Sequence, residues 1–226
     1  MFWQEKKSEK FVVPRDVVDF AYRIDCKSLP LDHAYALAQQ LLRLAPWLED
    51  EPHAGIHTIH VAASGNGWQR PEDSEHELLQ VSKRTRLNIR IPGHRVEQAE
   101  ALAGAVLDID GHRLTLGKGQ VKLLSDSTTV FSRQVVCLDN ETEDAFLQRQ
   151  AQELQDKGIR VSKMLCGRSG QLKTADGTVP TRTLMLADLT MQESVLLQQT
   201  GIGPMRLLGC GLVIPHKGIA PVVAED

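Results

Sequence analysis

The predicted strands and helices occur twice in the same order along this chain, and this repeat constrains its fold more than any other feature. Val17 to Cys26 alternates apolar and polar residues as a strand does. A helix should follow, with Asp32 as its N-cap and an apolar face that ends before Pro46. The first half then continues with strands at Gly55 to Ala63 and Arg84 to Pro92, a helix at Val96 to Val106, and a last strand over HRLTLG and QVKLL, bent at Gly117-Lys118-Gly119.

The second half repeats this β-α-β-β-α-β order. Thr190 and Glu193 have the spacing of a capping box, which predicts the start of the second helix of this half. The predicted elements are a strand at Phe131 to Leu138, a helix at Thr142 to Lys157 ended by Gly158, a hairpin of Ile159 to Cys166 and Thr181 to Leu186 around the loop GRSGQLKTADG, a helix from Thr190 to Gly201, and a strand at Leu212 to Ile214.

This order is that of the ferredoxin-like (RRM-like) arrangement, in which two helices cover one face of an antiparallel sheet. The expected fold class is therefore α+β, with two tandem ferredoxin-like domains. We expect an N-terminal extension at 1–14, a first domain at 15–126 and a second at 127–226. The fold alone does not give the function, because it serves ligand sensors, metal carriers and RNA binders alike.

Composition narrows the class of protein further. The chain has 226 residues and a net charge of −3, no apolar run long enough for a membrane span, and a start that lacks the apolar core of a signal peptide, so we expect a cytoplasmic protein without membrane contact. Its four cysteines are scattered singly, which predicts reduced, buried thiols and neither a zinc site nor a disulfide framework. We expect no cofactor.

The positive charges are unevenly distributed despite the negative total. Residues 157–175 contain no acid, and Arg113, Lys118 and Lys122 form a second basic segment. Such segments are consistent with a local anion-binding face. They are equally consistent with a solvated edge whose charges discourage strand pairing.

The C-terminal segment GIGPMRLLGCGLVIP contains more glycines than a helix end requires. Gly201 is explained as a C-cap, but Gly203, Gly209 and Gly211 are not. A glycine loop can offer successive N–H groups to a phosphate, and the guanidinium of Arg206 can bind an oxyanion.

A helix followed by this segment, at the end of a double ferredoxin-like chain, resembles the glycine-rich motif of the CRISPR-associated repeat-processing endoribonucleases of the RAMP superfamily. Their pattern is G-x-G, a short basic segment and a second G-x-G before the last strand, which Gly201, Gly203, Arg206, Gly209 and Gly211 match. The segments LPLDHAYAL, GIHTIHVA and SKRTRLNIRIP also resemble a branch of this family.

The resemblance implies a metal-independent endoribonuclease that binds the stem-loop repeat of CRISPR precursor RNA and cuts it once. In such a reaction the 2′-hydroxyl attacks the adjacent phosphorus and leaves a 2′,3′-cyclic phosphate, so DNA cannot be cut. The resemblance also implies that mature crRNA can be retained together with other CRISPR-associated subunits of an interference complex.

The candidate acid–base residues are histidines, because their pKa lies near neutrality. Several family members carry theirs mid-helix, where this chain has Ala38, so the role must lie elsewhere. We rank His57 first, followed by His53 in the loop after the helix and by His33 in the first helical turn, where Tyr35 is close by. His33 can equally be a polar residue beside an N-cap, and His53 an exposed loop residue.

The candidate RNA contacts surround the third predicted strand and extend through the second half. Trp68 is the candidate for base stacking. Phosphate contacts of this kind give affinity but little sequence reading, and the cations of the third strand can instead be the solvent side of an edge strand. The predicted RNA-binding residues are Lys83, Arg84, Arg86, Arg90, Arg160, Lys163, Arg168, Lys173, Gly201, Gly203, Arg206, Gly209 and Gly211.

Two alternatives stay open at this stage. Ala38 in place of a histidine is compatible with a non-catalytic RAMP-type subunit that binds crRNA structurally. A double ferredoxin-like chain can also be a small-ligand sensor, although such a protein has no evident use for the additional glycines or the basic segments.

Overall fold

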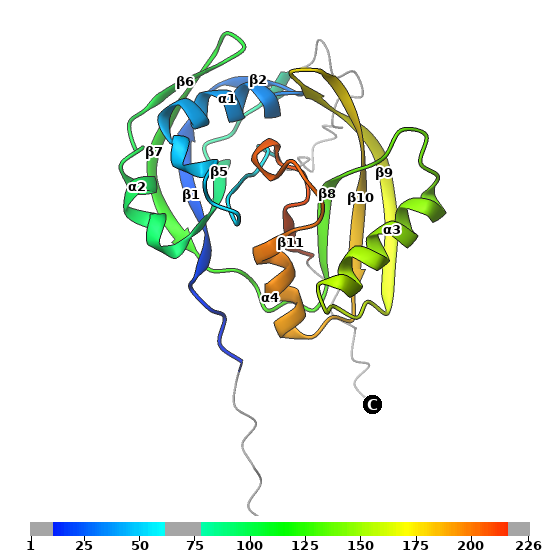
Figure 1. Cartoon of the computed structure of the whole chain (residues 1–226). Helices are drawn as coiled ribbons and strands as arrows, with labels where there is room; N and C mark the ends of the chain where they lie inside the picture. The colour runs from blue at the N-terminus through cyan, green and yellow to red at the C-terminus, as the bar shows by residue number, and fades with distance from the viewer. Residues whose placement is uncertain (1–10, 62–77, 217–226) are drawn as a thin grey trace, which may run out of the picture.

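The computed structural model describes residues 11–61 and 78–216 and contains two antiparallel sheets with helices packed against each (Figure 1). The first sheet has the strand order β3-β5-β1-β7-β6 and the second β11-β8-β10-β9. Without β6, both are the strand order of a ferredoxin-like domain, which confirms the predicted fold class. Trp68 lies outside the described residues.

The first sheet and its helices are built by residues 17–122. Its strands are β1 (Val17–Asp25), β3 (Gly55–Ile56), β5 (Arg86–Pro92), β6 (Val106–Ile109) and β7 (His112–Lys122), and its helices are α1 (Ala34–Leu44), η1 (Pro46–Leu48), η2 (Gly93–Arg95) and α2 (Val96–Glu100). A separate pair joins β2 (Ser28–Pro30) to β4 (Leu78–Gln80).

The second sheet and its helices follow after a short connection. Their elements are β8 (Val130–Val136), α3 (Glu143–Asp156), β9 (Lys163–Thr174), β10 (Gly177–Ala187), α4 (Met191–Thr200), η3 (Arg206–Leu208) and β11 (Val213–Pro215). The predicted division at residue 126 falls between β7 and β8.

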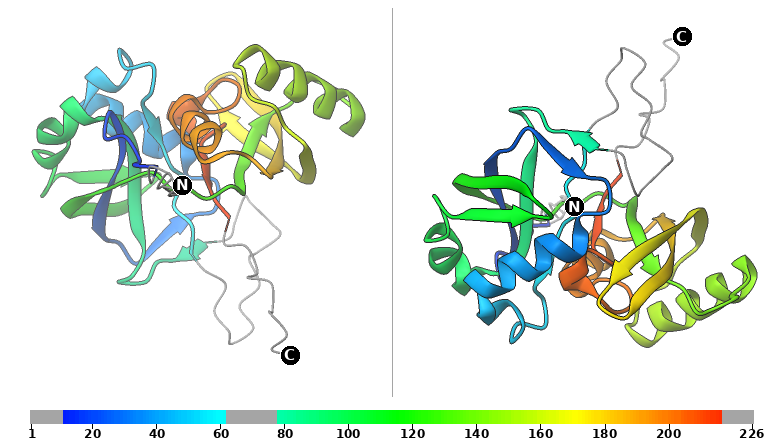
Figure 2. Two further views of the ribbon diagram at one scale, coloured as in Figure 1. Left: turned by 90° about the horizontal axis from the view of Figure 1, so that it is seen from below. Right: turned by 90° about the horizontal axis from the view of Figure 1, so that it is seen from above.

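The alternation along β1 separates two faces of the first sheet. Phe20 and Tyr22 are fully buried in a core with Leu37 and Leu41 of α1. Asp19 and Arg23 have the opposite parity and lie on the face turned away from α1, which we call the open face. In both domains the helices cover the same side of the molecule (Figure 2).

Local signals in the sequence explain several boundaries. Thr190 and Glu193 form the expected capping box, and Gly158, with a φ of 75°, ends α3. The predicted bend at Gly117 is a register shift between β1 and β7. A Cβ atom at Gly117 would lie 3.2 Å from Cβ of Arg23.

Other boundaries differ from the prediction. α1 begins at Ala34, so that His33 rather than Asp32 is its N-cap. The helix predicted to reach Val106 ends at Glu100, because residues 106–109 pair with β7 around the turn Asp110-Gly111. The predicted loop GRSGQLKTADG is mostly strand, since β9 and β10 pair as far as Thr174 and Gly177.

The two domains share a polar and apolar junction. Arg90 of β5 is fully buried and donates to the main-chain oxygens of Gln198 and Val213, at 2.7 and 2.9 Å. Leu172 of β9 packs with Ala34 of α1 and with Cys210. Figure 1 shows α4 and the glycine-rich segment between the two sheets.

Candidate active site and nucleic-acid interface

The glycine-rich segment, residues 201–211, clasps the first domain, and we call it the clasp. Arg206 donates through Nε to the carbonyl oxygen of Ala54 at 3.1 Å and through Nη2 to that of His53 at 2.8 Å. Nη2 also donates to the carbonyl oxygen of Gln199 at 2.9 Å, at the end of α4. Arg206 therefore fixes the loop after α1 against the second domain.

Close packing accounts for three of the four clasp glycines. A Cβ at Gly201 would meet Nη1 of Arg206 at 2.2 Å, and one at Gly211 would meet the carbonyl oxygen of Ile202 at 1.9 Å. A Cβ at Gly209 would lie 2.8 Å from the side chain of Thr58. All four glycines, including Gly203, have φ between 64° and 87°, where side chains are disfavoured.

The glycine N–H groups are already occupied, contrary to the expectation of a phosphate cradle. Gly201 donates to Leu197 O, Gly209 to Arg206 O and Gly211 to Gln134 O. The N–H of Gly203 donates to the carboxylate of Glu153 at 2.9 Å. The structure thus gives the clasp glycines a role in packing, and their N–H groups are not directed at a ligand.

Arg206 is an unusual cation because its described hydrogen-bond acceptors are carbonyl oxygens. Burial lowers its pKa to about 10, and the charge of Arg90 acts in the same direction. Its Nη1 is enclosed without a hydrogen-bond partner among the described residues. A buried, incompletely paired guanidinium costs stability.

His53 lies directly at this contact. Its carbonyl oxygen accepts from Arg206, and its Nδ1 is enclosed without a partner in the described chain. The residue is half-buried, and of its two ring nitrogens only Nδ1 is enclosed. The ring can therefore present Nε2 outward.

His57 occupies a different environment on the open face of the first sheet. Its Nε2 lies 3.3 Å from Oδ1 of Asp19, and its side chain is 13% exposed. Burial lowers the pKa of His57, and the adjacent carboxylate of Asp19 offsets only part of that effect. Nε2 of His57 is thus engaged by a carboxylate.

His33 is buried with both ring nitrogens engaged, an environment that favours a structural role over the predicted role as a base. It is 2% exposed, its Nδ1 lies 2.9 Å from the carbonyl oxygen of Pro30, and the N–H of Ile59 donates to its Nε2 at 2.9 Å. Because Pro30 O can only accept and Ile59 N–H can only donate, the ring is the neutral Nδ1–H tautomer. Tyr35, two residues on, is half-buried.

The predicted RNA-binding cations are dispersed. Lys83 and Arg84 are exposed and Arg86 is half-buried near the start of β5, whereas Arg90 is enclosed by its interdomain bonds and cannot be a surface contact. Arg160, Lys163, Arg168 and Lys173 are exposed along the edge strand β9 and its approach. Lys163 pairs with Asp188 at 2.8 Å. At about 3.3 Å per residue, Lys163 and Lys173 lie roughly 30 Å apart.

Asp19 is the residue that sequence reasoning missed. Burial alone would raise its pKa, but the charges of Arg90 and His57 outweigh burial and hold the pKa far below the usual range. The available signal was an acid within the otherwise apolar run Val17 to Tyr22.

The family of proteins described as "Cas6 Crispr" has a sequence model that matches residues 18–218. The chain belongs to the Cas6 family. This confirms the family recognised from the clasp sequence and from the double ferredoxin-like order.

Relatives of known sequence or structure agree with this assignment. A "CRISPR-associated endonuclease Cas6" of Myxococcus xanthus (strain DK1622) is 28% identical over 205 residues, which are 91% of this chain and 84% of that protein. The structure of a Cas6-related protein of Pyrococcus furiosus matches with a TM-score of 0.59 and 13% identity, over 89% of this chain and 99% of that one. A structure described as "An RAMP protein binding different RNA substrates" matches with a TM-score of 0.60 and 13% identity, over 87% and 98%.

Within residues 11–61 and 78–216, no group of three His, Cys, Asp or Glu side chains could hold a metal ion. None of the described helices is long and apolar enough to cross a membrane.

Proposed function

We propose that this Cas6 family member is a metal-independent endoribonuclease that binds the repeat of CRISPR precursor RNA and cuts it to mature crRNA. Membership of the family and the endonuclease named among its relatives support the reaction class. The observation that carries the assignment of the site is the hydrogen bond from Arg206 of the clasp to the carbonyl oxygen of His53.

We assign the acid–base role to His53 rather than to His57. His53 lies where both domains meet, in a loop whose backbone Arg206 fixes, and it can direct Nε2 outward. His57 has its Nε2 beside Asp19 and is largely enclosed. Tyr35 stays a candidate catalytic residue.

The reaction is balanced without a metal. The 2′-oxygen forms a bond to the adjacent phosphorus while its proton passes to a base, and the bond from phosphorus to the 5′-oxygen breaks. The leaving 5′-oxygen takes a proton, which gives a 2′,3′-cyclic phosphate and a 5′-hydroxyl. A neutral imidazole can accept the first proton, and an imidazolium can supply the second.

The exposed cations Lys83, Arg84, Arg160, Arg168 and Lys173 are proposed to contact phosphates of the repeat, together with Arg86 and Lys163. Their contribution is affinity and register rather than base recognition. The clasp glycines act indirectly, because they let Arg206 approach the loop of His53.

The test uses the purified protein in EDTA with the repeat RNA of its own locus and with copies bearing 2′-deoxy at one nucleotide each. We expect a single cut that one deoxy substitution abolishes. His53→Ala should lower the single-turnover rate at least 100-fold with binding retained. His94→Ala is the matched control, because it removes an exposed imidazole whose one hydrogen bond among the described residues is to Glu51.

Each other outcome has a definite meaning. Tight binding without a cut would assign the chain to the non-catalytic crRNA-binding subunits. Loss of cutting in His57→Ala but not in His53→Ala would move the acid–base role to His57. Absence of binding to the repeat would overturn the proposal and favour a ligand sensor.

A further inference from the structure

Two arginines face each other on the open face of the first sheet. Arg23 of β1 and Arg86 of β5 are direct partners in the antiparallel register. They have the parity of Asp19 and Arg90, so their side chains leave the sheet on the side away from α1. Like charges directly opposite each other in a sheet are destabilising.

No carboxylate offsets this repulsion within the described chain. Neither arginine forms an ion pair there; Arg86 donates through Nη1 to the carbonyl oxygens of Lys83 and Thr85, at 2.9 and 2.8 Å. On the other side of Arg23 lies Gly117, where a Cβ would approach Cβ of Arg23 to 3.2 Å. Gly117 therefore lets β7 pack closely against the backbone of Arg23.

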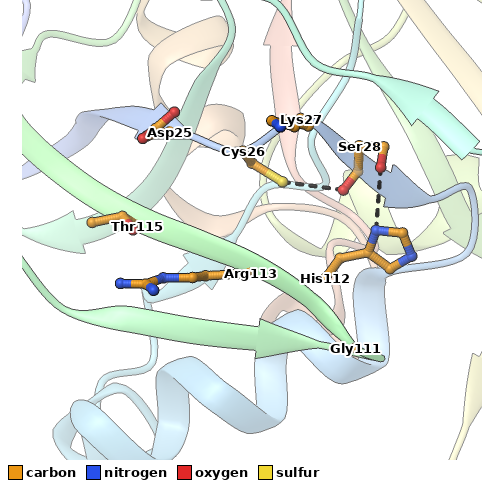
Figure 3. A pocket seen from close by; sticks show the side chains of 8 residues that line it. All are labelled: Asp25, Cys26, Lys27, Ser28, Gly111, His112, Arg113 and Thr115. Atoms are coloured by element: carbon orange, nitrogen blue, oxygen red, sulfur yellow. Dashed lines mark hydrogen bonds between the residues drawn. The ribbon is translucent and has the colours of Figure 1, made fainter.

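A polar pocket lies between the end of β1, the start of β2 and the first residues of β7 (Figure 3). Its volume is about 460 Å³, and its lining includes the cations Lys27 and Arg113 and the ring of His112, which contacts Oγ of Ser28 at 3.3 Å. Asp25 is its one carboxylate among the described residues, and it forms no ion pair there. Asp25 and Thr115 are partners in register, so the pocket adjoins the face that carries Arg23.

The geometry points to a phosphate-binding surface formed by Arg23, Arg86, Arg113 and Lys27, which takes the sugar–phosphate backbone of the bound RNA. This inference rests on the proposed function and adds a part of the RNA path that lies on the first sheet. The described pocket lining contains no Phe, Tyr or Trp on which a base could stack. The proposed contact of the RNA with this surface is therefore through its phosphates. An anionic backbone accounts for the paired arginines, because it supplies the missing negative charge.

The experiment measures the affinity for repeat RNA made uncleavable by 2′-deoxy at the cut site, over a range of salt concentrations. Arg23→Gln and Arg113→Gln should each weaken binding about 5-fold, and each should lower the slope of log affinity against log salt by about 0.7 to 1. Arg23→Lys should retain most of the affinity. Arg15→Gln is the control, since Arg15 is an exposed cation just before the opposite end of β1.

The double variant Arg23→Gln/Arg113→Gln separates this inference from the proposed function. Its affinity for the uncleavable RNA should fall about 25-fold, whereas the cut that the wild-type protein makes in cleavable RNA tests the proposed function. If the wild type binds tightly and the double variant has the same slope of log affinity against log salt, the phosphate-binding surface is refuted. That result would not contradict the proposed endoribonuclease activity. Wild-type binding without any cut would contradict only the reaction, and absence of wild-type binding would overturn both.

Discussion

Arg90 of β5 and Asp19 of β1 form a bidentate ion pair, with Nε to Oδ1 at 2.8 Å and Nη2 to Oδ2 at 3.1 Å. The same guanidinium donates through Nη1 to two carbonyl oxygens of the second domain. One buried side chain thus satisfies a carboxylate in one domain and two main-chain acceptors in the other.

Replacing Arg90 should therefore destabilise both the sheet and the domain junction. Arg90→Met leaves the buried carboxylate of Asp19 with His57 as its one described ion-pair partner and leaves two carbonyl oxygens without their donor, so we expect a loss of about 3 to 5 kcal/mol in the free energy of unfolding. Urea denaturation at neutral pH measures it. Arg15→Met, at an exposed position, should change stability by less than about 0.5 kcal/mol. A loss below about 1 kcal/mol in Arg90→Met would contradict the structural role.

The ion pair should also give the protein a specific acid sensitivity. The pKa of Asp19 is lower in the folded than in the unfolded chain, so its contribution to stability is complete above the unfolded pKa of about 3.9 and is lost as pH falls below it. Glu51, Glu141 and Glu193 have lowered pKa values too and contribute with the same sign. The contribution of Asp19 is therefore isolated by comparing the pH dependence of stability of the wild type with that of Asp19→Asn.

Below pH 3.9, the wild-type unfolding free energy should fall more steeply with pH than that of Asp19→Asn, by up to about 1.4 kcal/mol per pH unit. Urea titrations between pH 5 and pH 3 give both slopes. Equal slopes would show that Asp19 is not held ionised by Arg90.

The order of elements was predictable because each half of the chain contains strong local signals. The apolar faces of α1 and α3, the capping box of Thr190 and the glycine that ends α3 depend only on neighbouring residues. The turn Asp110-Gly111 is an equally local signal for the hairpin of β6 and β7. The helical spacing of apolar residues from Val96 to Val106 competes with it and predicts a helix that is too long. The short pair of β2 and β4 joins distant segments, so no local pattern indicates it.

The site was less predictable because its contacts cross between domains. Alternation correctly places Arg86 and Arg90 on one face of β5, but it cannot say that the second domain covers Arg90 and leaves Arg86 half-buried. The clasp glycines likewise match a family pattern, whereas their packing against Arg206, Thr58 and Ile202 depends on tertiary structure.

The clasp predicts different costs for two glycines with the same backbone conformation. Gly203 and Gly211 have φ of 67° and 64°, so alanine at either position should cost about 1 to 2 kcal/mol of backbone energy. At Gly211 the new Cβ would also lie 1.9 Å from the carbonyl oxygen of Ile202, whereas at Gly203 the nearest atom is 4.0 Å away.

We expect Gly211→Ala to lose at least about 2 kcal/mol more unfolding free energy than Gly203→Ala, and to disturb RNA cleavage as well. Urea denaturation of the two variants at the same pH gives the comparison. Equal losses would mean that the loop rearranges freely and does not clasp the first domain.

The last prediction concerns Arg206 as a positioning residue for His53. Lysine at 206 keeps a positive charge but cannot reproduce the planar fork that joins the oxygens of His53, Ala54 and Gln199. A small displacement of a catalytic group can cost about 100-fold in rate, so Arg206→Lys should lower the single-turnover cleavage rate by roughly 10- to 100-fold. Its affinity for uncleavable repeat RNA should stay within about 3-fold of the wild type, because the described partners of the Arg206 guanidinium are main-chain oxygens of the protein and lysine retains the charge. A thermal melt checks that the variant is folded under the assay conditions. A rate equal to that of the wild type would remove Arg206 from the mechanism, and an equal loss of affinity and rate would instead place it in direct contact with RNA.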